Sequence, residues 1–221
     1  MNAKILTMAT LTASAVFAGG LDFNYIGGST TVKDKSAATS GFEMVYDMSS
    51  DKTGFFGVIK ARLKGGDNAN TNIESNLGYQ IGDVKEYGIA KLTVAGLAYD
   101  SYTAKAYTDD PKFYLLSYRA GVGYQKDNLL LDGLDAYAGV YYLKGLESAF
   151  DSTLGSTSNF SKPKGTEAEI GVSYRFTKSL SANVGYFYKK LSFEDTRDSS
   201  VSVSAFDIKE SQIRAGLGFR F

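Results

Sequence analysis

The chain ends on the stretch Gln212-Ile213-Arg214-Ala215-Gly216-Leu217-Gly218-Phe219-Arg220-Phe221, in which every second residue is apolar. The apolar set would share one face of an extended segment, and glycine, glutamine and arginine would share the other. Strict period-two alternation over this length predicts a β-strand with one apolar and one polar face. The stretch therefore predicts a sheet whose two faces meet different surroundings.

This segment resembles the closing strand of bacterial outer-membrane β-barrels, which ends on an aromatic residue. The resemblance implies an all-β fold, a transmembrane antiparallel up-and-down β-barrel that faces outer-membrane lipid. It also implies that the barrel assembly machinery reads Phe221. In general layout the chain is similar to OmpA/OmpX/Opa-type or porin-like barrels. The shared features are generic to that architecture, so they identify no single family and transfer no functional residue.

The amino terminus predicts export. Lys4 precedes an apolar run over residues 5–17, and Val16-Phe17-Ala18 offers the small residues that a signal peptidase needs. The run is too short to cross a bilayer as a helix. We therefore predict a signal peptide over 1–18, cleaved after Ala18, and one β-barrel domain over 19–221 in the bacterial outer membrane.

Composition narrows the class of protein. The 24 basic residues balance the 24 acidic ones, which argues against a nucleic-acid partner. High glycine and tyrosine with only two prolines is typical of a strand-rich chain, and the absence of cysteine excludes a disulfide framework. No apolar run after residue 18 is long enough for a spanning helix, so membrane crossing has to be by strands.

Alternation predicts ten strands, with eight or twelve left open. They lie near 20–29, 41–49, 54–64, 73–82, 87–101, 113–126, 133–144, 166–177, 179–190 and 208–221. The links are expected to alternate between short turns and longer polar loops, the arrangement of a barrel with periplasmic turns and surface loops. The fifth strand keeps its inward register only if a β-bulge lies near Ala95 or Gly96.

Charged residues in these strands are sorted by face. The outward positions carry apolar residues and no charge, whereas Lys or Arg at the lipid midplane would cost about 2–4 kcal/mol each. Tyrosine and phenylalanine gather near both strand ends, as in the aromatic girdles of membrane barrels. The candidate lumen charges are Glu43, Lys60, Arg62, Glu74, Arg119, Asp135, Glu167, Glu169, Arg175, Arg214 and Arg220.

The chain contains no histidine and no cysteine. Outer-membrane barrel enzymes, including the ten-stranded omptin-like proteases, depend on a histidine base, and a Ser–His–Asp triad is likewise impossible here. We therefore expect no catalytic residue, no cofactor and no metal site. Glu167 and Glu169 share one face and could in principle act as an acid–base pair. Ion pairs with lumen arginines are the expected role of these two acids.

A barrel of about ten strands is filled largely by its own side chains. The sequence therefore predicts a monomer with a structural or surface-interaction role through its extracellular loops. Phe150, Phe160, Phe193 and Phe206 lie in the loops near 145–165 and 190–207, where they either contact a surface ligand or pack on the barrel mouth. The alternative is a narrow porin-like channel whose lumen arginines set the ion preference.

Overall fold

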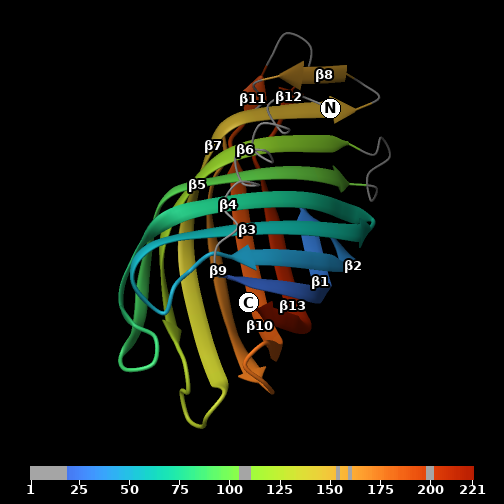
Figure 1. Cartoon of the computed structure of the whole chain (residues 1–221). Helices are drawn as coiled ribbons and strands as arrows, with labels where there is room; N and C mark the ends of the chain where they lie inside the picture. Colours follow the sequence, from blue (N-terminus) through green and yellow to red (C-terminus); the bar gives the residue numbers. More distant parts are fainter. Residues whose placement is uncertain (1–18, 105–110, 153–154, 159–160, 198–201) are drawn as a thin grey trace.

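The computed structural model describes residues 19–104, 111–152, 155–158, 161–197 and 202–221, which form an antiparallel barrel (Figure 1). Its wall strands are β1 Gly20–Val32, β2 Lys35–Asp47, β3 Lys52–Gly66, β4 Asn68–Asp83, β5 Gly88–Ala104, β6 Lys112–Lys126, β7 Leu134–Ser152, β9 Lys164–Arg175, β10 Leu180–Phe193 and β13 Phe206–Arg220. The short strands β8 Gly155–Ser158, β11 Thr196–Arg197 and β12 Ser202–Val203 lie at one end. None of the described residues forms a helix long and apolar enough to cross a membrane.

The wall closes because every wall strand pairs with two neighbours. Successive wall strands pair antiparallel, and β1 pairs with β13 from Gly20 opposite Arg220 to Val32 opposite Ile208. Closure leaves no strand edge with unpaired backbone groups. The predicted antiparallel barrel of ten strands is confirmed, and the alternatives of eight and twelve strands are not.

The two rims of the barrel differ. The turn rim, lower in Figure 1, holds the start of β1 and the end of β13. It also holds the links 48–51, 84–87, 127–133 and 176–179. The opposite end, the loop rim, holds the longer links after β5, β7 and β10. The predicted turns at the turn rim are confirmed.

Two of the predicted long loops are wrong. The link between β1 and β2 is Lys33-Asp34 alone, and the link between β3 and β4 is Asp67 alone. Positive φ angles of 58° at Lys33 and 116° at Gly66 serve these tight hairpins. Polar residues without alternation predict loops in these regions, but polar side chains are compatible with strands that continue beyond the apolar part of the wall.

The bulge predicted in the fifth strand is confirmed. On the β4 side, Leu77 pairs with Ala95 and Gly78 pairs with Thr93, so Val94 is the extra residue. Val94 and Ala95 both lie exposed on the outer face. The Tyr118 hydroxyl donates a hydrogen bond of 2.6 Å to the Val94 carbonyl. The bulge lets Thr93 and Asp100 both face inward although their spacing in the sequence is odd.

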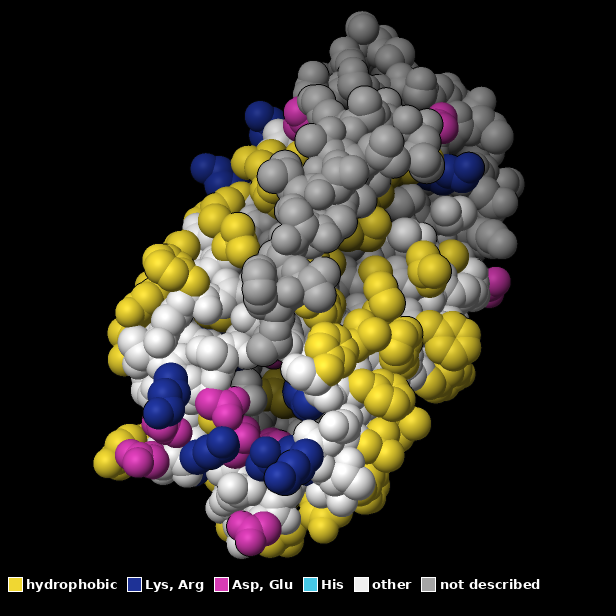
Figure 2. Space-filling model, in the orientation of Figure 1, with side chains coloured by type: hydrophobic (Ala, Val, Ile, Leu, Met, Phe, Trp, Pro, Cys, Tyr) yellow, Lys and Arg dark blue, Asp and Glu magenta, His cyan; other side chains and the backbone are white. Residues whose placement is uncertain are grey.

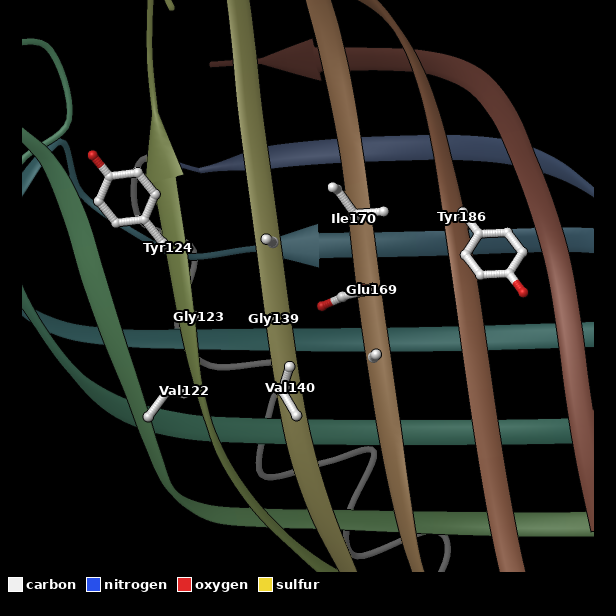
Figure 3. A pocket seen from close by; sticks show the side chains of 10 residues that line it. Val122, Gly123, Tyr124, Gly139, Val140, Glu169, Ile170 and Tyr186 are labelled. Carbon is white, nitrogen blue, oxygen red and sulfur yellow. The ribbon is translucent and has the colours of Figure 1, made fainter.

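The outer face of the wall is apolar, as predicted, and yellow side chains follow both flanks in Figure 2. Edge-on aromatic pairs lie on it, with ring centroids 5.9 Å apart for Tyr25 and Phe42 and 5.3 Å apart for Phe55 and Tyr79. A shallow hollow of about 350 Å³ on the outside of β6, β7, β9 and β10 has Tyr124 at one side and Tyr186 at the other (Figure 3). The outer surface of this barrel therefore carries the apolar side chains that a water-soluble protein buries in its core.

Candidate functional site

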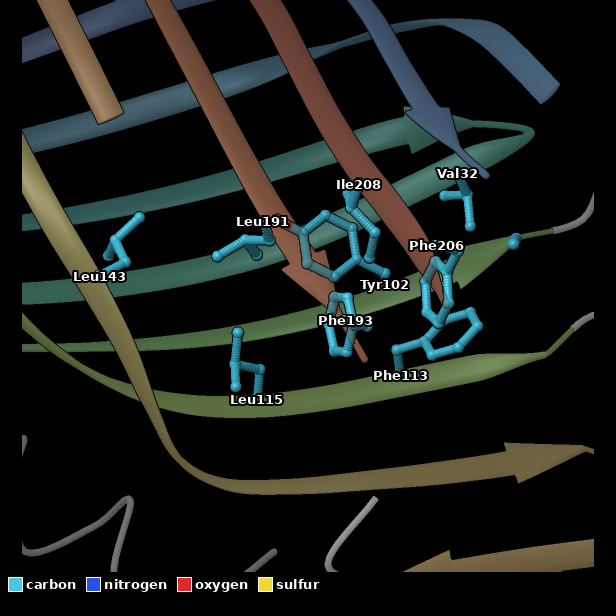
Figure 4. Close-up of a cluster of buried hydrophobic side chains, with 10 residues drawn as sticks. Val32, Tyr102, Phe113, Leu115, Leu143, Leu191, Phe193, Phe206 and Ile208 are labelled. Carbon is cyan, nitrogen blue, oxygen red and sulfur yellow. The ribbon is translucent and has the colours of Figure 1, made fainter. Parts of the chain in front are cut away.

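Inward side chains fill the loop end of the lumen with an apolar cluster, here called the apolar cap. Its members are Val32, Tyr102, Ala104, Phe113, Leu115, Leu143, Leu191, Phe193, Phe206 and Ile208. Figure 4 shows the rings of Phe113, Phe193 and Phe206 gathered at the ends of their strands. The Phe193 and Phe206 rings are parallel with centroids 4.6 Å apart, and Phe113 lies 5.3 Å from Phe206.

The apolar cap decides between two interpretations of the loop phenylalanines. Phe193 and Phe206 are buried inside the wall. Phe150 packs against the apolar cap, with its ring centroid 5.2 Å from that of Phe113. These three therefore pack on the barrel mouth and are not presented for surface contact. Phe160 lies outside the described residues.

A layer of twelve buried charged residues, here called the charged layer, crosses the lumen next to the apolar cap. It contains Lys60, Arg62, Lys64, Arg119, Lys189 and Arg214 with Glu43, Glu74, Asp100, Glu167, Glu169 and Glu210. Six cations thus face six carboxylates. Burial of single charges is costly unless each is paired and hydrogen bonded. The equal numbers allow the layer to be neutral as a whole.

Arg62 and Arg119 form the centre of the charged layer. Arg62 donates to Glu43 at 2.6 Å and to Glu74 at 2.7 Å, and its guanidinium lies 4.1 Å above the Phe187 ring. Arg119 donates to Glu167, and its guanidinium carbon lies 3.3 Å from the centroid of the Tyr141 ring. Stacking on aromatic faces adds cation–π attraction in this water-poor interior.

Further pairs join the centre to both sides. Toward the turn rim, Arg214 donates to Glu169 at 3.0 Å, and the Lys60 ammonium lies 2.7 Å from the same carboxylate. Toward the apolar cap, Lys189 bonds both Asp100 oxygens at 2.7 Å, and the Tyr102 hydroxyl donates to Glu210 at 2.5 Å. Lys64 pairs with the same Glu210. Arg214 also donates to Glu43 at 3.3 Å. Asn72 bridges Arg62 and Asp100, and Tyr102 bridges Asp100 and Glu210. The charged layer is thus one connected network.

Between the charged layer and the turn rim lies a cavity of about 780 Å³ with a mixed polar and apolar lining, here called the turn-side cavity. Figure 2 shows basic and acidic side chains around a hollow at this end. Asn24 and Asn76 line its walls, and Arg220 lies at its mouth. In the described part of the chain, no cluster of three or more His, Cys, Asp or Glu could hold a metal ion.

One cluster of charges fixes the turn between β6 and β7. Arg175 donates to Asp135 at 2.9 Å and lies 3.4 Å from Asp127. Burial raises the pKa of Asp127, the Asp135 carboxylate raises it further, and Arg175 opposes the rise. The Asn128 side chain accepts a hydrogen bond of 3.0 Å from Arg175, so this arginine holds the turn in place.

Inward glycines make room for large lumen side chains. The Tyr137 hydroxyl occupies the space that a Cβ on Gly171 would take, and it accepts a hydrogen bond of 2.6 Å from Arg214. We expect Gly171→Ala to displace Tyr137 and to lower the free energy of unfolding by about 1–3 kcal/mol, the usual cost of overpacking. Urea unfolding of the refolded protein in lipid vesicles measures the change.

Gly65→Ala is the matched control, because the nearest atom to a Cβ there is 4.0 Å away. Its effect should stay within about 0.5 kcal/mol. Equal losses from the two variants would contradict a steric role for Gly171.

The structure brings most of the candidate lumen charges into one place. Glu43, Lys60, Arg62, Glu74, Arg119, Glu167, Glu169 and Arg214 all belong to the charged layer. Asp135 and Arg175 pair at the turn rim instead, and Arg220 is exposed at the cavity mouth. The signal peptide predicted over 1–18 lies outside the described residues.

The candidate lumen charges did not include four members of the charged layer: Lys64, Asp100, Lys189 and Glu210. Lys64 continues the alternation of Lys60 and Arg62, and Glu210 continues that of Gln212 and Arg214, so the signal was present. Asp100 was hidden by the register change at the bulge. The buried asparagines at 68, 70 and 72 were not among them either, because a run of polar residues predicts a loop.

No protein-family model matches this chain, and no curated protein matches its sequence. Among solved structures it is similar to Neisserial surface protein A, with 16% identity, 92% of this chain and 97% of that chain covered, and a TM-score of 0.48. It is also similar to the translocator domain of the autotransporter NalP from Neisseria meningitidis, with 10% identity, 99% of this chain and 94% of that chain covered, and a TM-score of 0.46. A third similar structure is Ail, the attachment invasion locus protein of Yersinia pestis, with 14% identity, 93% of this chain and 100% of that chain covered, and a TM-score of 0.40. These likenesses concern the path of the chain and say nothing about ligand or activity.

Proposed function

We propose that this chain is an integral β-barrel of the bacterial outer membrane with a closed lumen. Its role is structural, or is carried by contacts of its extracellular loops. The observation that carries the proposal is the lumen itself, where the charged layer and the apolar cap follow one another along the barrel axis. Their side chains are buried and occupy the space that a conducting path would need.

The outer face supports the membrane location. Large apolar side chains such as Phe55 and Ile81 are 84% and 65% exposed, which would be unfavourable over so wide a surface in water. Hydrocarbon solvates such a surface, and in the closed wall every wall strand pairs with a neighbour on each side. The proposal includes export by a signal peptide over 1–18, a monomeric state and recognition of Phe221 by the barrel assembly machinery.

A non-enzymatic role is part of the proposal. Glu167 and Glu169, the acid pair on one face of β9, bind Arg119 and Lys60 respectively. A carboxylate engaged in this way is a poor proton acceptor for a substrate. Hydrolysis of lipid or peptide by the purified, refolded protein would contradict this part.

Conductance in planar bilayers tests the closed lumen. We expect the inserted protein to show no stable open level, because the charged layer fills the lumen cross-section. A stable open level would favour the alternative, a narrow porin-like channel. In that case Arg119→Ala or Arg214→Ala should alter its ion preference. Lys85→Ala should not, because Lys85 is exposed at the turn rim and does not line the turn-side cavity.

A further inference from the structure

Two pairs of lysines stand directly opposite each other across neighbouring strands. Lys144 of β7 pairs in register with Lys164 of β9, and Lys190 of β10 pairs with Lys209 of β13. Like charges in such positions destabilise strand pairing. Two of these pairs in adjacent parts of one wall therefore call for a compensating anion.

The two pairs form one surface. β9 and β10 are neighbours, and Lys190 lies opposite Thr166, two residues along the same face from Lys164. Diagonal neighbours of this kind are roughly 7–8 Å apart. The four lysines, here called the lysine patch, thus extend over four consecutive strands of the wall.

The lysine patch faces outward, just beyond the apolar part of the wall. Lys144 follows the buried Leu143, and Lys190 follows the buried Lys189, so strand alternation turns both lysines away from the lumen. Lys144 lies two residues past Tyr142, and Lys190 lies two residues past Tyr188. Two residues of a strand span about 7 Å, so each lysine is about 7 Å nearer the loop rim than the tyrosine of its own strand. This is the level at which lipid headgroups would meet the wall.

Carboxylates compensate only part of this charge. Asp207 lies 3.0 Å from the Lys190 ammonium and 4.0 Å from that of Lys209. Glu194 lies 3.8 Å from Lys164, with both side chains largely exposed. Among the described residues, Lys144 has no carboxylate within ion-pair distance. Two acids thus accompany four lysines.

We propose that the lysine patch binds the phosphate-bearing headgroup of an outer-leaflet lipid. This inference rests on the proposed membrane location. A lipid fits better than a soluble sulfated or phosphorylated glycan, because the lysines lie on the side of the wall and continue the lipid-facing surface. A headgroup phosphate at this level would lie between the opposed ammonium groups while its acyl chains follow the apolar wall below.

The fluorescence of a single introduced tryptophan tests the proposal, because the chain has no tryptophan of its own. Tyr142→Trp places the reporter two residues from Lys144. The protein is refolded into phosphatidylcholine vesicles that contain either acyl-brominated phosphatidic acid or acyl-brominated phosphatidylcholine at the same mole fraction. We expect stronger quenching by the phosphatidic acid, because each lysine should enrich an anionic headgroup roughly fivefold.

The reporter is then combined with K144Q/K164Q or with the control pair K52Q/K85Q, which removes the same charge at the turn rim. The first pair should abolish the preference for phosphatidic acid, and the control should keep it. Equal quenching by both lipids in the unsubstituted patch would overturn the inference. So would heparin binding in detergent that depends on Lys144 and Lys164, without any lipid preference. Absence of quenching by either lipid would instead contradict the membrane location.

Discussion

Arg119→Met is expected to lower the free energy of unfolding by about 3–5 kcal/mol, because it leaves Glu167 as an uncompensated charge in the lumen. Both side chains are fully buried, and Arg119 also lies 4.0 Å from Glu74. Urea unfolding of the refolded protein in lipid vesicles, followed by circular dichroism, measures the change.

The double variant Arg119→Met/Glu167→Gln separates charge from packing. It removes both members of the pair, so most of the lost stability should return. Lys85→Met is the control, because Lys85 and its partner Asp51 are exposed, and we expect no measurable change. If the double variant were as unstable as Arg119→Met alone, the loss would come from packing on Tyr141 and not from the unpaired carboxylate.

Val140→Arg is expected to cost about 2–4 kcal/mol, because it places a cation in hydrocarbon near the middle of the wall. Val140 is 56% exposed on the outer face of β7. In a water-soluble protein, a charged residue at so exposed a position would change the free energy of unfolding by no more than about 0.5 kcal/mol. The same urea unfolding experiment measures the effect in vesicles.

Ser40→Arg is the matched control for depth. Ser40 is also exposed on the outside but lies two residues beyond Phe42 toward the loop rim. A cation there should cost about 0–1 kcal/mol. If Val140→Arg proved as mild as Ser40→Arg, the outer face near Val140 would have to be in contact with water.

The sorting of residues between the two faces of the wall follows from the sequence alone. Side chains alternate strictly along a strand, so Arg119 and Glu167 could be assigned to the lumen from their apolar neighbours. The partners could not be assigned. Lys60 and Glu169 are separated by 109 residues, and their contact depends on the register of every strand between them. Period-two patterns are local and carry no information about that register.

The strand ends beyond the apolar belt were the least predictable part. Thr39 and Asn68 read as loop because polar residues there show no alternation of hydrophobicity, yet both are buried in strands. Outside the hydrocarbon, the outer side of a strand can be as polar as the inner side, and the signal disappears. The apolar cap was hidden for a related reason. Phe193 and Phe206 are apolar residues that face inward, which reverses the pattern of the wall.

The central claim is that hydrocarbon solvates the outer face of this barrel. Refolding of the chain from urea with and without detergent micelles tests it most directly, with circular dichroism and size-exclusion chromatography as the measurements. The account predicts a monomeric, strand-rich protein only when micelles are present, and aggregation in their absence. A folded monomer in plain buffer would contradict it.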